Sequence, residues 1–170
     1  MAESSTVATS AQKVASEESL QVVSFSLGGE EFGVDILKVQ EINRMVEVTR
    51  VPNSPVYVEG VINLRGKVIP IINLRQRFGI EDQKRDSNTR IVVVELTGVV
   101  VGFLVDSVQE VLRIPRTVIE PPPAITGGQH SDYITAVGKL EDRLLILLDL
   151  EKVLRKDEIA NITREDSRAA

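Results

Sequence analysis

Short, largely apolar runs of strand length, separated by glycine-containing turns, recur along most of this chain. The clearest pair covers residues 61–64 and 68–72, which are rich in β-branched side chains, with Arg65-Gly66-Lys67 between them as a tight turn. The pattern predicts a β-hairpin over residues 60–74. Pro70 lacks an amide hydrogen, so its place in the second strand favours a sheet edge or a bulge.

A first hairpin is predicted nearer the N-terminus, with strands at 21–27 and 31–36 around a turn at Gly28-Gly29. The segment before it, residues 1–19, is rich in Ser, Ala, Thr and Glu without a sustained period, so we expect a disordered tail. Residues 156–170 are charged and weakly periodic, and a final helix beginning near residue 150 is expected to fray into solvent there.

Three short helices are expected between the strands. Asp35 could cap a helical turn over residues 35–42, with Ile36 and Val39 facing inward, before a strand at 46–51.

The other two lie on either side of the main hairpin. Pro55 follows a capping Asn-Ser pair, which predicts a short helix over 55–59 that ends at Gly60. After the hairpin, Asn73 can cap a helix over 74–78 that Gly79 closes.

The second half of the chain repeats the first. At a constant offset of 69 residues, Val22, Val23, Leu27, Gly29, Gly33, Val39, Gln40, Glu41, Ile42 and Pro52 fall on Ile91, Val92, Leu96, Gly98, Gly102, Val108, Gln109, Glu110, Val111 and Pro121. After an insertion in the proline-rich loop 121–132 the offset becomes 76, and Tyr57, Val61, Leu64, Asn73, Leu74 and Phe78 match Tyr133, Val137, Leu140, Asp149, Leu150 and Leu154.

Two copies of about 57 residues, each with about five short strands, favour two small β-barrels over a solenoid, which needs three or more repeats. We therefore expect a mostly β domain over residues 20–155, with repeat halves at about 21–79 and 90–155 and a polar junction between them. Phe25, Phe32, Phe78 and Phe103 lie in apolar runs and are assigned to the cores.

Comparison of the two copies separates shared scaffold from what is particular to one copy. The tip Arg65-Gly66-Lys67 becomes Glu141-Asp142-Arg143 in the second copy, so only the first tip is net positive. The tips are either plain solvated turns, or the first one recognises an acidic group or a set of carbonyls through Arg65. Glu41 is likewise either a solvated residue or a functional one, and Val39 and Val108 are assigned to the barrel cores.

Composition excludes several classes of function. The chain has no cysteine, one histidine and a net charge of −5, which argues against disulfides, thiolate metal sites and nucleic acid or anionic lipid as the main partner. The longest apolar run, residues 99–105, is far shorter than the roughly 20 residues of a membrane helix, and the N-terminus lacks a secretory signal pattern. His130, Ser131 and Asp132 are sequence neighbours and are not a catalytic triad, which is assembled by geometry.

Three segments together resemble the CheW family of chemotaxis coupling proteins: Phe32-Gly-Val-Asp-Ile-Leu-Lys-Val-Gln-Glu-Ile42, Gly60-Val-Ile-Asn-Leu-Arg-Gly-Lys-Val-Ile-Pro-Ile-Ile-Asn-Leu74 and Leu144-Leu-Ile-Leu-Leu-Asp-Leu150. The resemblance implies two pseudo-symmetric five-stranded β-barrels of SH3/OB-like type that exchange strands, no enzymatic activity and no cofactor. It further implies a cytoplasmic adaptor that bridges the hairpin tip of chemoreceptors to the regulatory domain of the histidine kinase CheA, with CheW–CheW ring contacts as an additional possibility.

The resemblance also assigns site residues. Receptor contact is expected in a groove near the junction of the barrels, at Val39, Glu41, Gly60, Asn63, Arg65, Gly102, Val108 and Val111. Kinase contact is expected at one end of the first barrel, at Glu59 and Val68, although the family often has a basic residue at the position of Glu59. Arg65 either touches the receptor directly or orients the groove through internal hydrogen bonds.

One other class of function fits a small barrel, namely a protein that binds single-stranded nucleic acid. Such a protein would need surface aromatic residues and a basic groove. Aromatic residues make up 4% of this chain and lie mostly in apolar runs, so the adaptor is the preferred interpretation.

Overall fold

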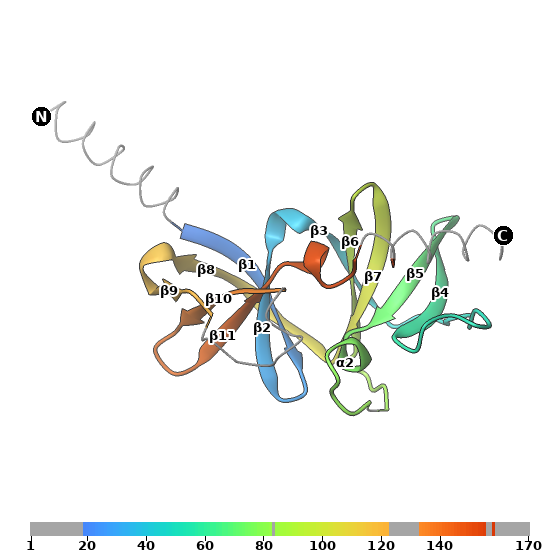
Figure 1. The fold of residues 1–170 in the computed structure, drawn as a ribbon, viewed down its shortest axis with the longest axis horizontal. Coiled ribbons are helices and arrows are strands. Elements are labelled where there is room, and N and C mark those ends of the chain that lie inside the picture. Colours follow the sequence, from blue (N-terminus) through green and yellow to red (C-terminus); the bar gives the residue numbers. More distant parts are fainter. Residues whose placement is uncertain (1–18, 83, 123–132, 156–157, 159–170) are drawn as a thin grey trace, which may run out of the picture.

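A computed structural model describes residues 19–82, 84–122, 133–155 and 158 (Figure 1). The strands are β1 (Ser19–Leu27), β2 (Glu30–Asp35), β3 (Val39–Arg44), β4 (Val58–Leu64), β5 (Lys67–Asn73), β6 (Arg90–Leu96), β7 (Val99–Val105), β8 (Ser107–Pro115), β9 (Ile119–Glu120), β10 (Ile134–Lys139) and β11 (Leu144–Leu148). Within these ranges the strands are connected by the short α-helix α2 (Leu74–Arg77) and the 3₁₀ turns η1 (Ile36–Lys38), η2 (Arg116–Val118) and η3 (Leu150–Lys152). The prediction of a mostly β fold is confirmed.

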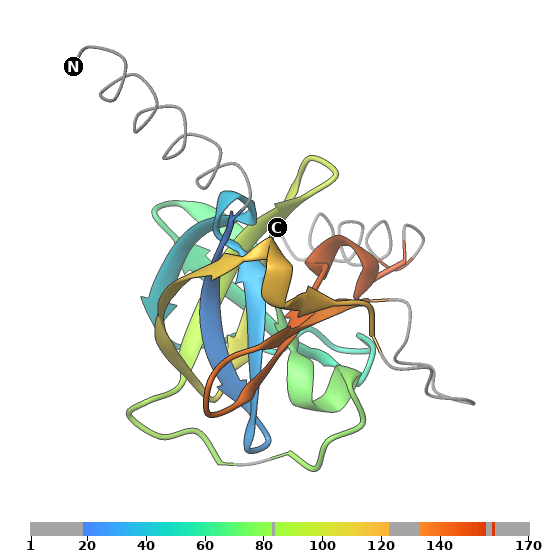
Figure 2. The ribbon, with the colours of Figure 1, turned by 90° about the vertical axis from the view of Figure 1, so that its left-hand side faces the viewer.

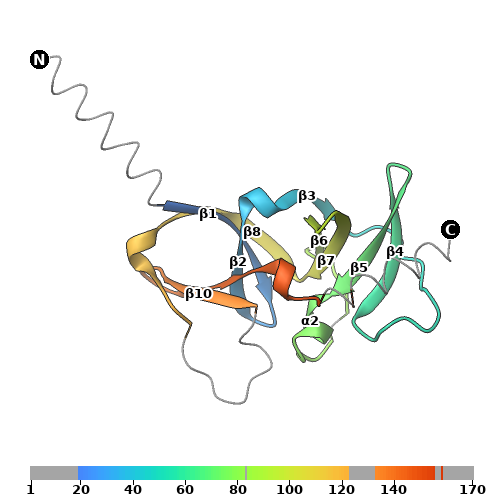
Figure 3. The same cartoon turned by 45° about the horizontal axis from the view of Figure 1, so that its top comes forward.

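The strands form two sheets that exchange strands between the repeats. Sheet A has the order β8-β1-β2-β11-β10-β9, and sheet B has the order β3-β6-β7-β5-β4. Each sheet curves into one of two lobes that lie side by side (Figures 1 and 3), and the view from the side of sheet A shows its strands curving around a common axis (Figure 2). The two barrel-like lobes and the exchange of strands between the repeats are confirmed, but sheet A has six strands and not the expected five, because the two-residue strand β9 pairs with β10 at its edge.

The sequence repeat maps directly onto these elements. The offset of 69 residues carries β1, β2 and β3 onto β6, β7 and β8, and the offset of 76 carries β4, β5 and α2 onto β10, β11 and η3. The parallel pairs β2–β11 and β5–β7 correspond in the same way. A pseudo-two-fold relation therefore connects the barrels, and a feature of one barrel can be compared with its counterpart in the other.

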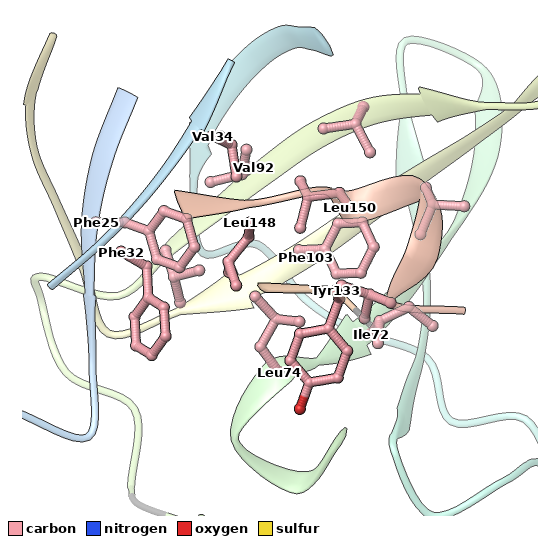
Figure 4. Close-up of a cluster of buried hydrophobic side chains, with 14 of the residues drawn as sticks. Phe25, Phe32, Val34, Ile72, Leu74, Val92, Phe103, Tyr133, Leu148 and Leu150 are labelled. Carbon is pink, nitrogen blue, oxygen red and sulfur yellow. The ribbon is translucent and has the colours of Figure 1, made fainter. Parts of the chain in front are cut away.

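Three apolar clusters follow from the alternation of side chains along the strands. One cluster fills barrel B and includes Ile71 and Ile91, while a second fills barrel A and includes Leu147 and Val22, their repeat counterparts. The largest cluster lies between the barrels and contains the four phenylalanines that were assigned to the cores: Phe25, Phe32, Phe78 and Phe103. Figure 4 shows part of this cluster and labels three of them, Phe25, Phe32 and Phe103. Because neighbouring residues of one strand point to opposite faces, strands such as β6 are buried on both sides.

Both predicted hairpins form. β1 pairs antiparallel with β2 around Gly28-Gly29, and β4 pairs antiparallel with β5. The tip of the second hairpin has Arg65 at φ 53° and Gly66 at φ 85°, the positive values of a two-residue type I′ turn. Asn63 fixes this turn, because its side-chain oxygen accepts a hydrogen bond of 2.9 Å from the amide of Gly66.

Two local predictions were wrong, and a third, the helical turn over residues 35–42, was confirmed only in part. The expected helix over 35–42 is only the three-residue turn η1, capped by Asp35 as predicted, and the strand then begins at Val39. The strand expected at 46–51 is reduced to a single bridge between Thr49 and Val61.

The expected helix over 55–59 is also absent. Asn53 has a left-handed φ of 64° and not the extended conformation of a helix cap, and Val58 already pairs with Ile72 in the sheet. By contrast, the helix after the hairpin is confirmed, since Asn73 accepts a hydrogen bond from the amide of Gln76 and Gly79 follows at φ 75°.

Pro70 occupies a position that requires no donor. Its cross-strand partner Val61 directs both backbone groups away from β5, to Thr49, and β5 pairs with β7 only from Ile71 onward. The strand is therefore interior at its C-terminal end and open on one side at Pro70, which agrees with the edge position that the sequence suggested.

Candidate functional site

The two edge strands of sheet B are joined by an ion pair between residues that the sequence singled out. Arg65, at the tip of the β4–β5 hairpin, donates from Nη2 to Oε2 of Glu41 on β3. Glu41 shares the barrel-interior face of β3 with Asn43, opposite the buried Val93 and Ile91. A carboxylate on that face needs partners, and Asn43 supplies the second one with a hydrogen bond of 2.7 Å to Oε1.

A comparable contact exists in the other barrel. Arg143 at the β10–β11 tip donates 3.2 Å to Glu110 on β8, the repeat counterpart of Glu41, and also lies 2.7 Å from Glu31. The arginine therefore stands at a different place in the tip but contacts the equivalent glutamate. This recurrence indicates that one role of the pair is to join the hairpin tip to the edge strand.

An apolar strip flanks the core between the barrels. Val39 on β3 and Val108 on β8 pack against the inter-barrel cluster, and Val111, 50% exposed, follows on the same side of β8. Ile42, 38% exposed, is a member of the strip that sequence analysis missed. The signal was available, because Ile42 is the repeat counterpart of Val111.

Gly60 and Gly102, which the resemblance assigned to receptor contact, are both buried. A Cβ atom at Gly102 would lie 2.6 Å from Ile71 Cδ1, and one at Gly60 would lie 2.1 Å from the carbonyl oxygen of Thr49. Both positions need glycine for packing, so they shape the barrel and offer little surface to a partner.

The outer face of the β4–β5 hairpin brings two predicted site residues together. Asn63 and Val68 are cross-strand partners, and Val68 is 43% exposed. They border a shallow depression of about 220 Å³ that residues 49–52 and 61–62 complete. One residue of the predicted receptor set and one of the predicted kinase set are therefore adjacent on this hairpin.

Glu59, the other residue expected to contact the kinase, is already bound within the chain. Its side chain accepts 2.7 Å from Nδ2 of Asn73 and forms an ion pair with Arg85, which also lies 3.1 Å from Asp82. The structure thus directs this carboxylate toward the junction of the two repeats.

A partly buried ion pair that sequence analysis missed joins the two barrels. Arg75 of α2 donates to both oxygens of Asp106, at 2.7 Å and 2.6 Å, and Asp106 also accepts 2.9 Å from the amide of Gly28. Burial alone would raise the pKa of Asp106, but the hydrogen bonds from Arg75 and Gly28 and the arginine charge hold it below its ordinary value. No local pattern indicates this pair, because its members lie 31 residues apart.

A second cluster surrounds Glu158. Arg77 donates to its two oxygens at 2.8 Å and 2.9 Å, and the hydroxyl of Tyr57 donates 2.7 Å to it. The Arg77 guanidinium also lies 4.9 Å from the centre of the Tyr57 ring. These contacts tie α2 to the segment that follows η3.

Nowhere among the described residues do three His, Cys, Asp or Glu side chains gather in a way that could hold a metal ion. None of the helices in the described ranges has the length and apolar character that a membrane crossing requires. His130, Ser131 and Asp132 lie outside the described residues, as do residues 1–18 of the expected N-terminal tail and most of the C-terminal one.

Comparison with known proteins gives a consistent result. The family model of the CheW-like domain matches residues 21–158. The chain is 44% identical over 136 residues to a chemotaxis protein CheW of Klebsiella aerogenes, covering 80% of this chain and 82% of the relative. It is 41% identical over 141 residues to a chemotaxis protein CheW of Helicobacter pylori, covering 83% and 85%.

A solved structure agrees with these relatives. The crystal structure of the scaffolding protein TtCheW from Thermoanaerobacter tengcongensis superposes with a TM-score of 0.75 at 37% identity, covering 82% of this chain and 94% of that one. The strand exchange, the duplicated barrels and the extent of the match lead to one conclusion: the chain belongs to the CheW family of non-catalytic chemotaxis adaptors.

Proposed function

We propose that this adaptor couples the cytoplasmic tip of chemoreceptors to the regulatory domain of the histidine kinase CheA and thereby controls autophosphorylation of that kinase. The observation that carries the proposal is the β4–β5 hairpin, whose tip pairs with Glu41 beside the apolar strip and whose outer face exposes Val68. One hairpin thus borders two separate surfaces, as a coupling protein requires.

The receptor surface in this proposal is the strip of Val39, Ile42, Val108 and Val111 together with the Glu41–Arg65 pair. A receptor hairpin is helical, and an amphipathic helix binds a groove through apolar side chains with polar contacts at the rim. Arg65 suits the rim, since 71% of its side chain is exposed even while it is paired.

The kinase surface is the outer face of the same hairpin around Val68 and the depression beside it. Glu59 is not part of this surface in the proposal, because its carboxylate is bound to Arg85 and Asn73. This arrangement supports an apolar kinase contact at Val68 and places no demand on a free charge at Glu59.

Ring contacts between copies of the chain are a further part of the proposal. The β4–β5 tip carries Arg65 and Lys67, whereas the matching β10–β11 tip carries Glu141 and Asp142. Leu144, 60% exposed, stands where the first copy has Val68. Opposite charge and exposed apolar side chains on equivalent faces favour head-to-tail association of copies of the chain. In this proposal the association takes place at receptor arrays, on the cytoplasmic side of the membrane.

Reconstitution of receptor, kinase and this protein on membranes tests the proposal. We expect kinase autophosphorylation to depend on the protein and to respond to the receptor ligand. Separate pull-downs with the receptor tip and with the kinase regulatory domain identify which contact exists. Kinase activity that is the same with and without the protein would reject the function.

A further inference from the structure

The backbone crosses between the two sheets twice within the described residues. The first crossing runs from β2 through η1 into β3, and the second runs from β7 through Asp106 into β8. Each crossing leads directly into an edge strand of the proposed receptor surface. Contacts that fix a crossing therefore also fix the position of β3 or β8, the strands that carry the apolar strip.

The second crossing is held by several contacts to Asp106, the single residue between β7 and β8. Its amide donates 3.1 Å to the carbonyl of Ser26, and its carboxylate accepts from the amide of Gly28, so it is bound to the β1–β2 hairpin. Arg75 donates a hydrogen bond to each carboxylate oxygen of Asp106, and only 12% of the Arg75 side chain is exposed. Such forked pairs fix orientation as well as distance.

Arg75, the partner of Asp106 at this crossing, belongs to a different part of the fold. It lies in α2, which follows β5 without a loop and so continues the hairpin that carries Val68. The Arg75–Asp106 pair thus connects the hairpin of the proposed kinase surface directly to β8, which carries Val108 and Val111. The path contains one ion pair, the four-residue helix α2 and the strand β8.

The first crossing is also held by an ion pair, but this pair is weaker and its charges are reversed relative to Arg75 and Asp106. Glu151, the repeat counterpart of Arg75, accepts a single hydrogen bond of 3.0 Å from Lys38, which precedes β3. Both side chains are about half exposed, at 52% and 42%. Exposed single pairs of this kind contribute little, so the two crossings differ in how firmly they are held.

We propose that Arg75 and Asp106 are positioning residues that transmit the effect of receptor binding at β8 to the kinase-binding β4–β5 hairpin. This inference rests on the proposed function. Neither residue belongs to either binding surface. Each surface is held locally, β8 by its long ladder with β1 and Val68 by its ladder with β4. The β5–β7 ladder and the inter-barrel core remain when the pair is lost, so both surfaces stay formed, but the side-chain connection between α2 and the start of β8 is removed.

The test uses the double variant Arg75→Met with Asp106→Asn in the full chain. Both charges are removed together, so no unpaired charge is buried, and the asparagine can still accept the Gly28 hydrogen bond. We expect affinities for the receptor tip and for the kinase regulatory domain within threefold of wild type, while receptor-dependent kinase activation falls at least tenfold. Arg75→Lys, which keeps the charge, is expected to retain at least a third of the activation.

The matched control is Lys38→Met with Glu151→Gln, which removes the exposed counterpart and is expected to change activation less than twofold. Activation within twofold of wild type in the Arg75/Asp106 variant would overturn the proposal. A parallel loss of both affinities and of activation would also overturn it, since that result indicates a merely structural pair. If the wild-type protein itself leaves the kinase unaffected, the proposed function fails, and this outcome is separate from the other two.

Discussion

Arg65 and Glu41 lie 24 residues apart in the chain and meet across the two edges of sheet B. The equivalent glutamate of the other barrel, Glu110, also contacts an arginine of its own hairpin tip. The arginine–glutamate contact recurs in both barrels although the arginine occupies a different position in each tip. Part of its role is therefore to close the barrel by joining the hairpin tip to the edge strand. What distinguishes the first copy is its net positive tip, next to Asn63 and the apolar strip.

The first prediction concerns this pair. Arg65→Ala is expected to lower the free energy of unfolding by no more than about 1 kcal/mol, because the side chain is mostly exposed. Receptor affinity is expected to fall by about 1 to 3 kcal/mol, as for a charge-assisted contact. Titration of the receptor tip, together with urea unfolding, measures both quantities.

A double-mutant cycle with Glu41→Ala distinguishes the two roles of Arg65. If Arg65 touches the receptor, it keeps an effect on affinity when Glu41 is absent. If it acts only through Glu41, the double variant binds like the Glu41 variant alone. A folded Arg65→Ala protein with wild-type affinity would reject direct contact.

Sequence alone could predict the elements that depend on local chemistry. Short sequence patterns predict the glycine turns, the Asn73 cap and the repeat itself, and the structure confirms them. The segment 35–42 misled for a physical reason: a 3₁₀ turn followed by a bulge at Gln40 spaces Ile36, Val39 and Ile42 three residues apart, as in a helix.

Contacts between distant segments were not accessible in this way. The repeat gives the same offsets whichever barrel a strand joins, so strand exchange came from the family resemblance. The Arg75–Asp106 pair has no local signal, and the burial of Gly60 and Gly102 depends on strands that pack against them. The candidate site was therefore predicted as a set of residues, and its geometry required the fold.

The second prediction tests the packing role of Gly102. A methyl group there would lie 2.6 Å from Ile71 Cδ1 and 2.7 Å from Ile91 Cγ2, inside barrel B. Gly102→Ala is expected to destabilise the fold by about 1 to 3 kcal/mol through overpacking. Gly138→Ala is the control, since its nearest neighbour would be 3.7 Å away, and urea unfolding of both variants should show the difference.

The third prediction concerns the kinase surface. Val68→Asp places a charge on an exposed position of β5, so the fold is expected to remain and binding of the kinase regulatory domain to weaken at least tenfold. Leu37→Asp, at a position of η1 that is 88% exposed, should leave this affinity unchanged. Equal affinities for the Val68→Asp and wild-type proteins would place the kinase elsewhere.

The last prediction uses the ionisation of Asp106. Burial raises the pKa of this carboxyl group, but the hydrogen bonds from Arg75 and Gly28 outweigh burial, so the pKa in the folded protein lies below the ordinary value of 3.8. A carboxyl group with a depressed pKa stabilises the fold fully above its ordinary value, and this stabilisation is lost as the pH falls through the folded-state pKa. Wild-type protein should therefore lose stability between roughly pH 5 and pH 2, in part through Asp106.

Asp106→Asn removes the ionisable group, so the variant should be less stable than wild type at pH 7 and should lose less stability on acidification. Urea unfolding across this pH range measures the slopes. Equal slopes for Asp106→Asn and wild type would show that the Asp106 carboxyl group binds protons alike in the folded and unfolded chains, which would contradict the role of Arg75 in holding it ionised.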